Sequence, residues 1–135
     1  MSAPRLRGCP TCSTPIEQAS TSLGLRDYRW VSKHLPGKVN PSDIDAVLER
    51  NDHFLLMEYK SPGAPVHMGQ RIMLKRLVRR GFDVWVVWGD QADDDSPVQV
   101  GVMTERGDFD EVHDMTAAEL GRAVAAWFEN AEEDA

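Results

Sequence analysis

An aspartate, a glutamate and a lysine lie in two short segments that we expect to pair as neighbouring β-strands. Asp45 is near the start of the first segment, and Glu58 and Lys60 end the second. Two carboxylates brought close together repel each other and resist ionisation unless a cation lies between them. Mg²⁺ prefers oxygen ligands, keeps several waters and is commonly held by one or two carboxylates. The three side chains predict a site for metal-assisted hydrolysis, in which the lysine orients the attacking water or stabilises developing charge.

The residues between the two segments favour a tight hairpin. Residues 44–50 and 53–60 have the composition of strands. Asn51-Asp52 lies between them, and both residue types tolerate the positive φ angles of a two-residue turn. The sequence therefore predicts a β-hairpin whose register is set by this turn.

This register collects four charged side chains on one face of the hairpin. It places Asp45 directly opposite Glu58, and it places Asp43 opposite Lys60. Opposed Cβ atoms lie about 4.5–5.5 Å apart, and residues two apart on a strand share a face. A slip of one residue would separate them. Asp45, Glu58 and the backbone carbonyl of Tyr59 are the expected metal ligands, with Asp43 as a further candidate.

The alternative is a set of exposed charges on a solvated strand, with a lysine–aspartate pair across the hairpin. The residues that precede Glu58 argue against it. Phe54 to Met57 are all apolar, so Glu58 and Lys60 end a strand that we expect to be buried.

These residues resemble a known signature. Pro41-Ser-Asp-Ile-Asp45, twelve intervening residues and Glu58-Tyr59-Lys60 resemble the P-D…(D/E)-x-K pattern of the PD-(D/E)XK nuclease superfamily. The segments IDAVLE and LLMEYK are similar to those of its RecB-like and phage-type members, and Gly69-Gln70 resembles the glutamine that follows on the next helix. The resemblance covers roughly residues 23–89.

The resemblance implies a fold and an activity. The fold class would be α/β, with an α-β-β-β-α-β core of the restriction-endonuclease type. A mixed central sheet would be flanked by helices and followed by a C-terminal hairpin and helix, and the first core strand would lie within 38–42. The activity would be Mg²⁺- or Mn²⁺-dependent hydrolysis of DNA phosphodiester bonds, with Asp45, Glu58, Lys60 and Gln70 as catalytic residues. The alternative is an inactive nuclease-like fold that binds nucleic acid or a protein.

A helix is predicted from Val66 or His67 to Arg80, with Gly81 as its stop. Gln70 is the polar residue at the start of its apolar stripe, where it would reach the metal site or substrate, or bond the helix backbone. Five basic residues lie mostly off this stripe and are either DNA phosphate contacts or an ordinary solvated face. They are Arg71, Lys75, Arg76, Arg79 and Arg80.

The remaining elements alternate in type, which predicts one central sheet in a mixed α/β arrangement. Residues 16–35 are a predicted helix, 82–88 a strand buried on both faces, and 89–97 an acidic loop. Residues 98–104 and 108–113 are predicted to form a second hairpin. A helix over 116–131 begins with the capping box of Thr116 and Glu119.

Cys9 and Cys12 form a C-x-x-C pair within residues 1–15, which we interpret as an N-terminal loop or knuckle ahead of a single nuclease-like domain over 16–135. Zinc requires four ligands, and no second pair of cysteines is present. The other ligands would come from histidines or from a second subunit, so zinc at Cys9 and Cys12 is left open.

The composition is that of a folded protein, with 135 residues, 41% hydrophobic and 27% charged. A net charge of −7 argues against a protein that coats nucleic acid non-specifically. No apolar run approaches the roughly 18 residues that span a bilayer, and no signal peptide is evident. We expect a cytoplasmic protein of a bacterium or phage-infected cell, with DNA as partner, no membrane, and a homodimer or larger DNA-processing complex as its assembly.

Overall fold

The computed structural model describes residues 28–37 and 39–132. The chain divides into two units, residues 1–41 and 42–135. The described part of the first unit contains the short helix α2 (Arg29–Ser32). The rest of the helix predicted over 16–35 and the Cys9–Cys12 pair lie largely or wholly outside the described residues. No helix in the described ranges combines the length and apolar character that crossing a membrane requires.

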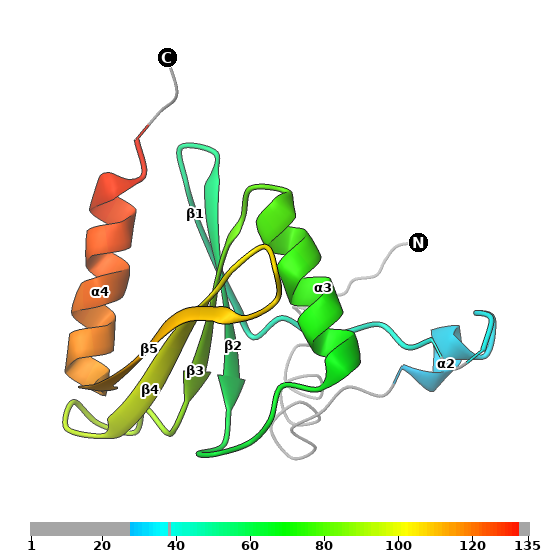
Figure 1. Ribbon diagram of the computed structural model, residues 1–135, viewed down its shortest axis with the longest axis horizontal. Coiled ribbons are helices and arrows are strands. Elements are labelled where there is room, and N and C mark those ends of the chain that lie inside the picture. The colour runs from blue at the N-terminus through cyan, green and yellow to red at the C-terminus, as the bar shows by residue number, and fades with distance from the viewer. Residues whose placement is uncertain (1–27, 38, 133–135) are drawn as a thin grey trace, which may run out of the picture. The chain divides into compact units, whose positions relative to one another are not determined.

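The second unit is a five-stranded mixed sheet with one helix on each face, as Figure 1 shows. Its strands lie in chain order across the sheet; β2 and β3 are parallel, and the other neighbouring pairs are antiparallel. This confirms the mixed α/β class. The elements are β1 (Ala46–Arg50), β2 (His53–Lys60), α3 (Met68–Arg79), β3 (Asp83–Trp88), β4 (Pro97–Met103), β5 (Phe109–Thr116) and α4 (Ala117–Asn130).

Two apolar layers hold the helices to the sheet. Alternate residues of β2 and β3 point to opposite faces. Leu56 and Val86 pack with Leu74 of α3 on one face. Val87 packs with Leu120 of α4 on the other. The stripe predicted for α3 is therefore its buried side, and its first turn comes close to the end of β2.

The predicted hairpin register is confirmed over five residue pairs, from Arg50–His53 to Ala46–Met57. The turn has the predicted chemistry, since Asn51 and Asp52 have φ angles of 52° and 70°. The first strand is shorter than predicted, because it begins at Ala46 instead of residue 44.

The expected first core strand is not found where the resemblance put it. Residues 39–42 form no strand, and Pro41 has no N–H to donate to a neighbouring strand. In the described part of the chain, two strands instead of three precede α3.

The C-terminal hairpin and helix are present as predicted. Thr116 and Glu119 form the capping box at the start of α4. At the other end of α4, Arg50 donates to the Phe128 carbonyl (2.8 Å) and Asn51 to the Ala131 carbonyl (2.8 Å). These bonds satisfy carbonyls that a helix end leaves free, and they fix α4 to the turn of the first hairpin.

Candidate active site

Glu58 is the buried charged residue at the end of β2, with 8% of its surface exposed. It lies on the face covered by α3, and Gln70 in the first turn of that helix donates from Nε2 to Glu58 Oε2 at 2.6 Å. Glu58 Oε1 and Gln70 Oε1 are also buried, and neither has a hydrogen-bond partner. Leaving such acceptors unpaired is costly. Two unpaired oxygens at one point indicate a place where a cation or donor binds.

The electrostatic surroundings of Glu58 oppose its ionisation. Burial raises the pKa of its carboxyl above the ordinary value of 4.5, and the charge of Asp45 raises it further. The hydrogen bond from Gln70 and the charge of Lys60 act in the opposite direction, and Asp43 has the smallest effect. A divalent cation would remove the cost of holding two carboxylates near each other.

Asp45 is outside the ladder in which it was expected to face Glu58. The β1–β2 pairing ends at Ala46–Met57, and the carboxylate of Asp45 accepts a hydrogen bond from the Tyr59 N–H (2.8 Å). The side chain thus replaces the backbone carbonyl that a continued β1 would have offered, a substitution typical of aspartate. Asp45 is still brought to the end of β2, by this bond instead of by strand register.

The Tyr59 carbonyl faces the same edge as its N–H, because both groups of one strand residue point to the same side. The next carbonyl, that of Lys60, points the other way and accepts from the Gly89 N–H at the end of β3 (2.9 Å). The Tyr59 oxygen therefore lies on the side of β2 where Asp45 binds, as a third oxygen ligand requires.

Lys60 is half-buried and lies two residues after Glu58 on the same strand face. Its charge reaches Glu58, since it lowers the pKa of that carboxyl. Asp43, the further candidate ligand, also acts on Glu58 through its charge, and its part in metal binding stays a prediction. Within the described ranges, no three His, Cys, Asp or Glu side chains form a group that could hold a metal ion. A cation here would rely on two carboxylates and a backbone carbonyl.

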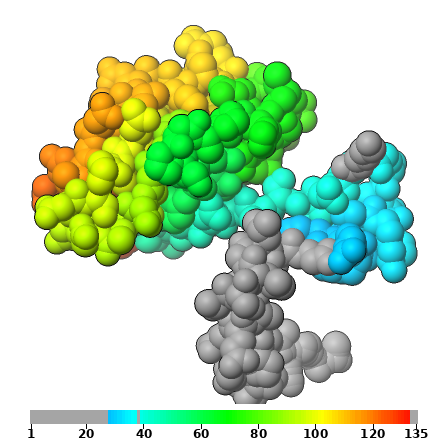
Figure 2. Space-filling model, turned by 90° about the horizontal axis from the view of Figure 1, so that it is seen from below, coloured from blue at the N-terminus to red at the C-terminus, as the bar shows by residue number. Residues whose placement is uncertain are grey.

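Sequence reasoning missed the contribution of Trp88. It is paired with Lys60 across the β2–β3 ladder, and its indole N–H donates to the Ala64 carbonyl (2.7 Å). The bond fixes the segment 61–67 between Lys60 and α3, which Figure 2 shows in green beside the yellow-green loop after β3. The one available signal was the position of a tryptophan at the end of a strand predicted to be buried on both faces.

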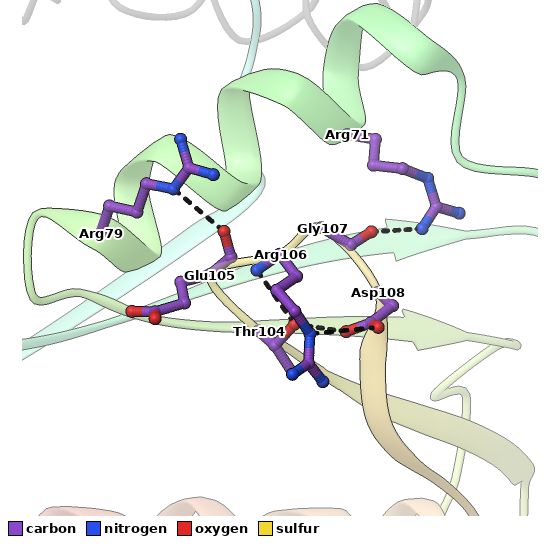
Figure 3. Close-up of polar contacts among 7 residues, drawn as sticks. All are labelled: Arg71, Arg79, Thr104, Glu105, Arg106, Gly107 and Asp108. Carbon is purple, nitrogen blue, oxygen red and sulfur yellow. Dashed lines mark hydrogen bonds and ion pairs between the residues drawn. The ribbon is translucent and has the colours of Figure 1, made fainter.

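The basic residues of α3 do not form one set. Arg71 donates to the Gly107 carbonyl, and Arg79 donates from Nε to the Glu105 carbonyl (3.0 Å), as Figure 3 shows. Both contacts hold the turn between β4 and β5 against α3. Contact of these arginines with DNA stays a prediction.

Comparison with protein-family models, with curated proteins and with solved structures returns no match for this chain. Its function is therefore inferred from the residues and their geometry. A hard divalent cation would fit three oxygen groups here. They are the unpaired buried oxygen of Glu58, the Asp45 carboxylate beside it, and the Tyr59 carbonyl on the side of β2 where Asp45 binds.

Replacing Gln70 by leucine is expected to raise the pKa of Glu58 further, because the hydrogen bond that it removes lowers that pKa. NMR titration of the Glu58 carboxyl carbon in metal-free protein would measure the change. Gln99→Leu is a matched control, since it breaks another glutamine–carboxylate bond, to Asp114 on the exposed side of the second hairpin. An unchanged Glu58 pKa in Gln70→Leu would contradict the assigned contact.

Proposed function

We propose that this protein is a nuclease of the PD-(D/E)XK type that hydrolyses DNA phosphodiester bonds with the help of Mg²⁺ or Mn²⁺. The observation that carries the proposal is the pair of buried, unpartnered oxygens on Glu58 and Gln70. It is supported by Asp45, which is bound to the strand that carries Glu58, and by Lys60 on the same strand face.

Each residue has a separate part in this proposal. Asp45, Glu58 and the Tyr59 carbonyl would hold the metal ion, which supplies Lewis-acid polarisation of the phosphate and a lower pKa for the attacking water. Gln70 keeps the Glu58 carboxylate in one orientation by its hydrogen bond. Lys60 donates hydrogen bonds to the attacking water or to a non-bridging phosphate oxygen, where negative charge develops in the transition state.

The substrate class is tested with linear, circular, single-stranded and branched DNA in the presence of Mg²⁺ or Mn²⁺. We expect cleavage of at least one of these substrates by the wild-type protein. Lys60→Ala should be roughly 100-fold slower or worse, by comparison with the loss of one positioned transition-state donor. Arg122→Ala removes an exposed positive charge from α4, on the other face of the sheet, and should cleave at the wild-type rate.

Two results would reject the proposal: cleavage of none of these substrates, or equal cleavage by Lys60→Ala and wild type. Calorimetric titration with Mn²⁺ separates the enzyme from a binding module that no longer cuts. Binding that Asp45→Ala abolishes supports the enzyme, whereas wild-type protein that binds no Mn²⁺ supports the module.

A further inference from the structure

The helix α3 is the main basic element of the second unit. No acidic residue occurs between Lys60 and Asp83, whereas the residues before and after this stretch are rich in carboxylates. A phosphate backbone is attracted to positive side chains and repelled by negative ones. The orientation of the basic side chains around this one helix therefore determines where a nucleic acid can approach.

One flank of α3 is engaged by the turn between β4 and β5. Arg71 binds the Gly107 carbonyl and lies over the Phe109 ring, with 5.6 Å between its Cζ atom and the ring centroid. Arg79 binds the Glu105 carbonyl. Lys75 packs so closely on Gly107 that a Cβ there would be 3.0 Å from the Lys75 Cδ atom. The three residues share this flank because they are four apart in the helix.

Arg76 and Arg80 lie off this flank. At about 100° per residue, Arg80 lies opposite Arg71 around the helix axis, and Arg76 lies between Arg80 and Arg79, about 60° from Arg79. Because the buried stripe faces the sheet and the β4–β5 turn lies beside the Arg71 flank, Arg80 lies on the flank toward the β1 edge, and Arg76 points between that flank and solvent. Both arginines are exposed, and among the described residues neither has an ion pair or side-chain hydrogen bond.

We propose that Arg76 and Arg80 contact the phosphate backbone of the DNA substrate, and that Arg71, Lys75 and Arg79 are structural. The proposal rests on the nuclease function proposed above, because it extends the path of the DNA from that site. The planar guanidinium group binds phosphate through two parallel hydrogen bonds, so a pair of exposed arginines is well suited to this contact.

The distances along α3 agree with one continuous path for the DNA backbone from the active site. Arg76 and Arg80 follow Gln70 by about 9 Å and about 15 Å along the helix axis, so they continue from the active site toward the β1–β2 turn. Glu49 is the acidic side chain on this side of β1. It lies at the far end from the site and accepts a hydrogen bond from the Asp52 N–H.

Carboxylate side chains disfavour the approach of DNA from other sides of the second unit. The loop after β3 contains Asp90 and Asp93 to Asp95, and the exposed edge strand β5 contains Asp110, Glu111 and Asp114. A duplex crossing either region would meet like charges. On the side between α3 and β1, Arg76 and Arg80 have no competing ion pair or side-chain hydrogen bond among the described residues of the second unit.

Binding is measured by fluorescence anisotropy with a short labelled duplex in the Lys60→Ala background, at one fixed Mg²⁺ concentration and varied KCl. Arg76→Gln with Arg80→Gln should weaken binding roughly tenfold and flatten the slope of log K against log salt by about 1.8, since each phosphate contact contributes about 0.9. Arg76→Lys with Arg80→Lys should keep the slope.

The matched control is Arg71→Gln with Arg79→Gln, which removes the same charge from the same helix. It should lower the melting temperature and leave the salt slope unchanged. The proposal would be overturned if the Arg76/Arg80 variant kept the wild-type salt slope, or if the control variant flattened the salt slope by the same amount. Cleavage is assayed separately with Lys60 intact. If the Arg76/Arg80 variant flattens the salt slope but the protein with Lys60 intact cleaves no DNA, only the nuclease function is rejected. If the protein cleaves DNA but the variant leaves the salt slope unchanged, only the proposed contact of Arg76 and Arg80 with DNA is rejected.

Discussion

Glu58→Gln is expected to abolish DNA cleavage and, in the same protein, to stabilise the metal-free fold at neutral pH. The loss of activity should be about 1,000-fold or more, because the amide removes a negatively charged metal ligand and the metal supplies the main stabilisation of transition-state charge. The gain in stability has a different origin, which is the burial of the carboxylate beside Asp45 and its unpaired Oε1 atom.

The direction of the stability change follows from proton linkage. The pKa of Glu58 is raised in the folded state, so the folded protein binds more protons than the unfolded chain between the unfolded pKa, about 4.5, and the folded one. The free energy of unfolding therefore falls as pH rises from the unfolded pKa to the folded one, and the full cost is present above that range. Glutamine carries no charge at any of these pH values. Its N–H₂ group also offers a donor to the unpaired Gln70 oxygen.

Thermal unfolding of metal-free protein at several pH values measures this effect. Glu58→Gln should melt above wild type at pH 7, and the difference should vanish near pH 4. Adding Mn²⁺ should raise the melting temperature of wild type and leave that of Glu58→Gln unchanged. Glu129→Gln, which neutralises an exposed glutamate on α4, is the control and should change stability by less than about 0.5 kcal/mol. A destabilised Glu58→Gln protein would contradict the assigned cost.

Gly89→Ala is expected to be the most destabilising single-methyl change near the site. Gly89 has a φ of +118°, which is strained for any L side chain. A Cβ there would lie 2.7 Å from the Pro97 carbonyl oxygen and 3.2 Å from the Val98 Cα atom. Both neighbours are backbone atoms and cannot rotate away. We expect a loss of roughly 2–4 kcal/mol from strain and overpacking together.

The same substitution should disturb catalysis, because the Gly89 N–H donates to the Lys60 carbonyl. Chemical denaturation measures the stability, and cleavage is assayed at a temperature where the variant is folded. Gly63→Ala is the matched control, since Gly63 has a φ of +75° but no atom within 4 Å of the added Cβ. It should lose only about 1–2 kcal/mol. Equal losses in the two variants would show that the overlap with Pro97 is relieved easily.

The sequence by itself determined the local features of this protein. The hairpin register follows from Asn51-Asp52, because two residues that tolerate positive φ select one turn and one pairing. The start of α4 follows from Thr116 and Glu119, since a capping box joins residues three apart. Apolar periodicity located Gln70 at the start of the buried stripe of α3. These features depend on contacts between residues that are close in the chain.

Only the tertiary structure decided how the site is completed. Asp45 reaches β2 by binding the Tyr59 N–H instead of pairing in the ladder, because β1 begins at Ala46, two residues later than predicted. The unpaired oxygens of Glu58 and Gln70 depend on how α3 packs over β2.

The difference between the two flanks of α3 could likewise not be predicted from the sequence. Arg71 and Arg76 are both basic and both lie off the apolar stripe, and nothing near them in the chain shows which of them is already engaged. Arg71 is bound by a turn 36 residues later, whereas the exposed Arg76 side chain has no such contact with any described residue. Periodicity shows which side of a helix is buried, but the folded chain decides which exposed charges are already engaged.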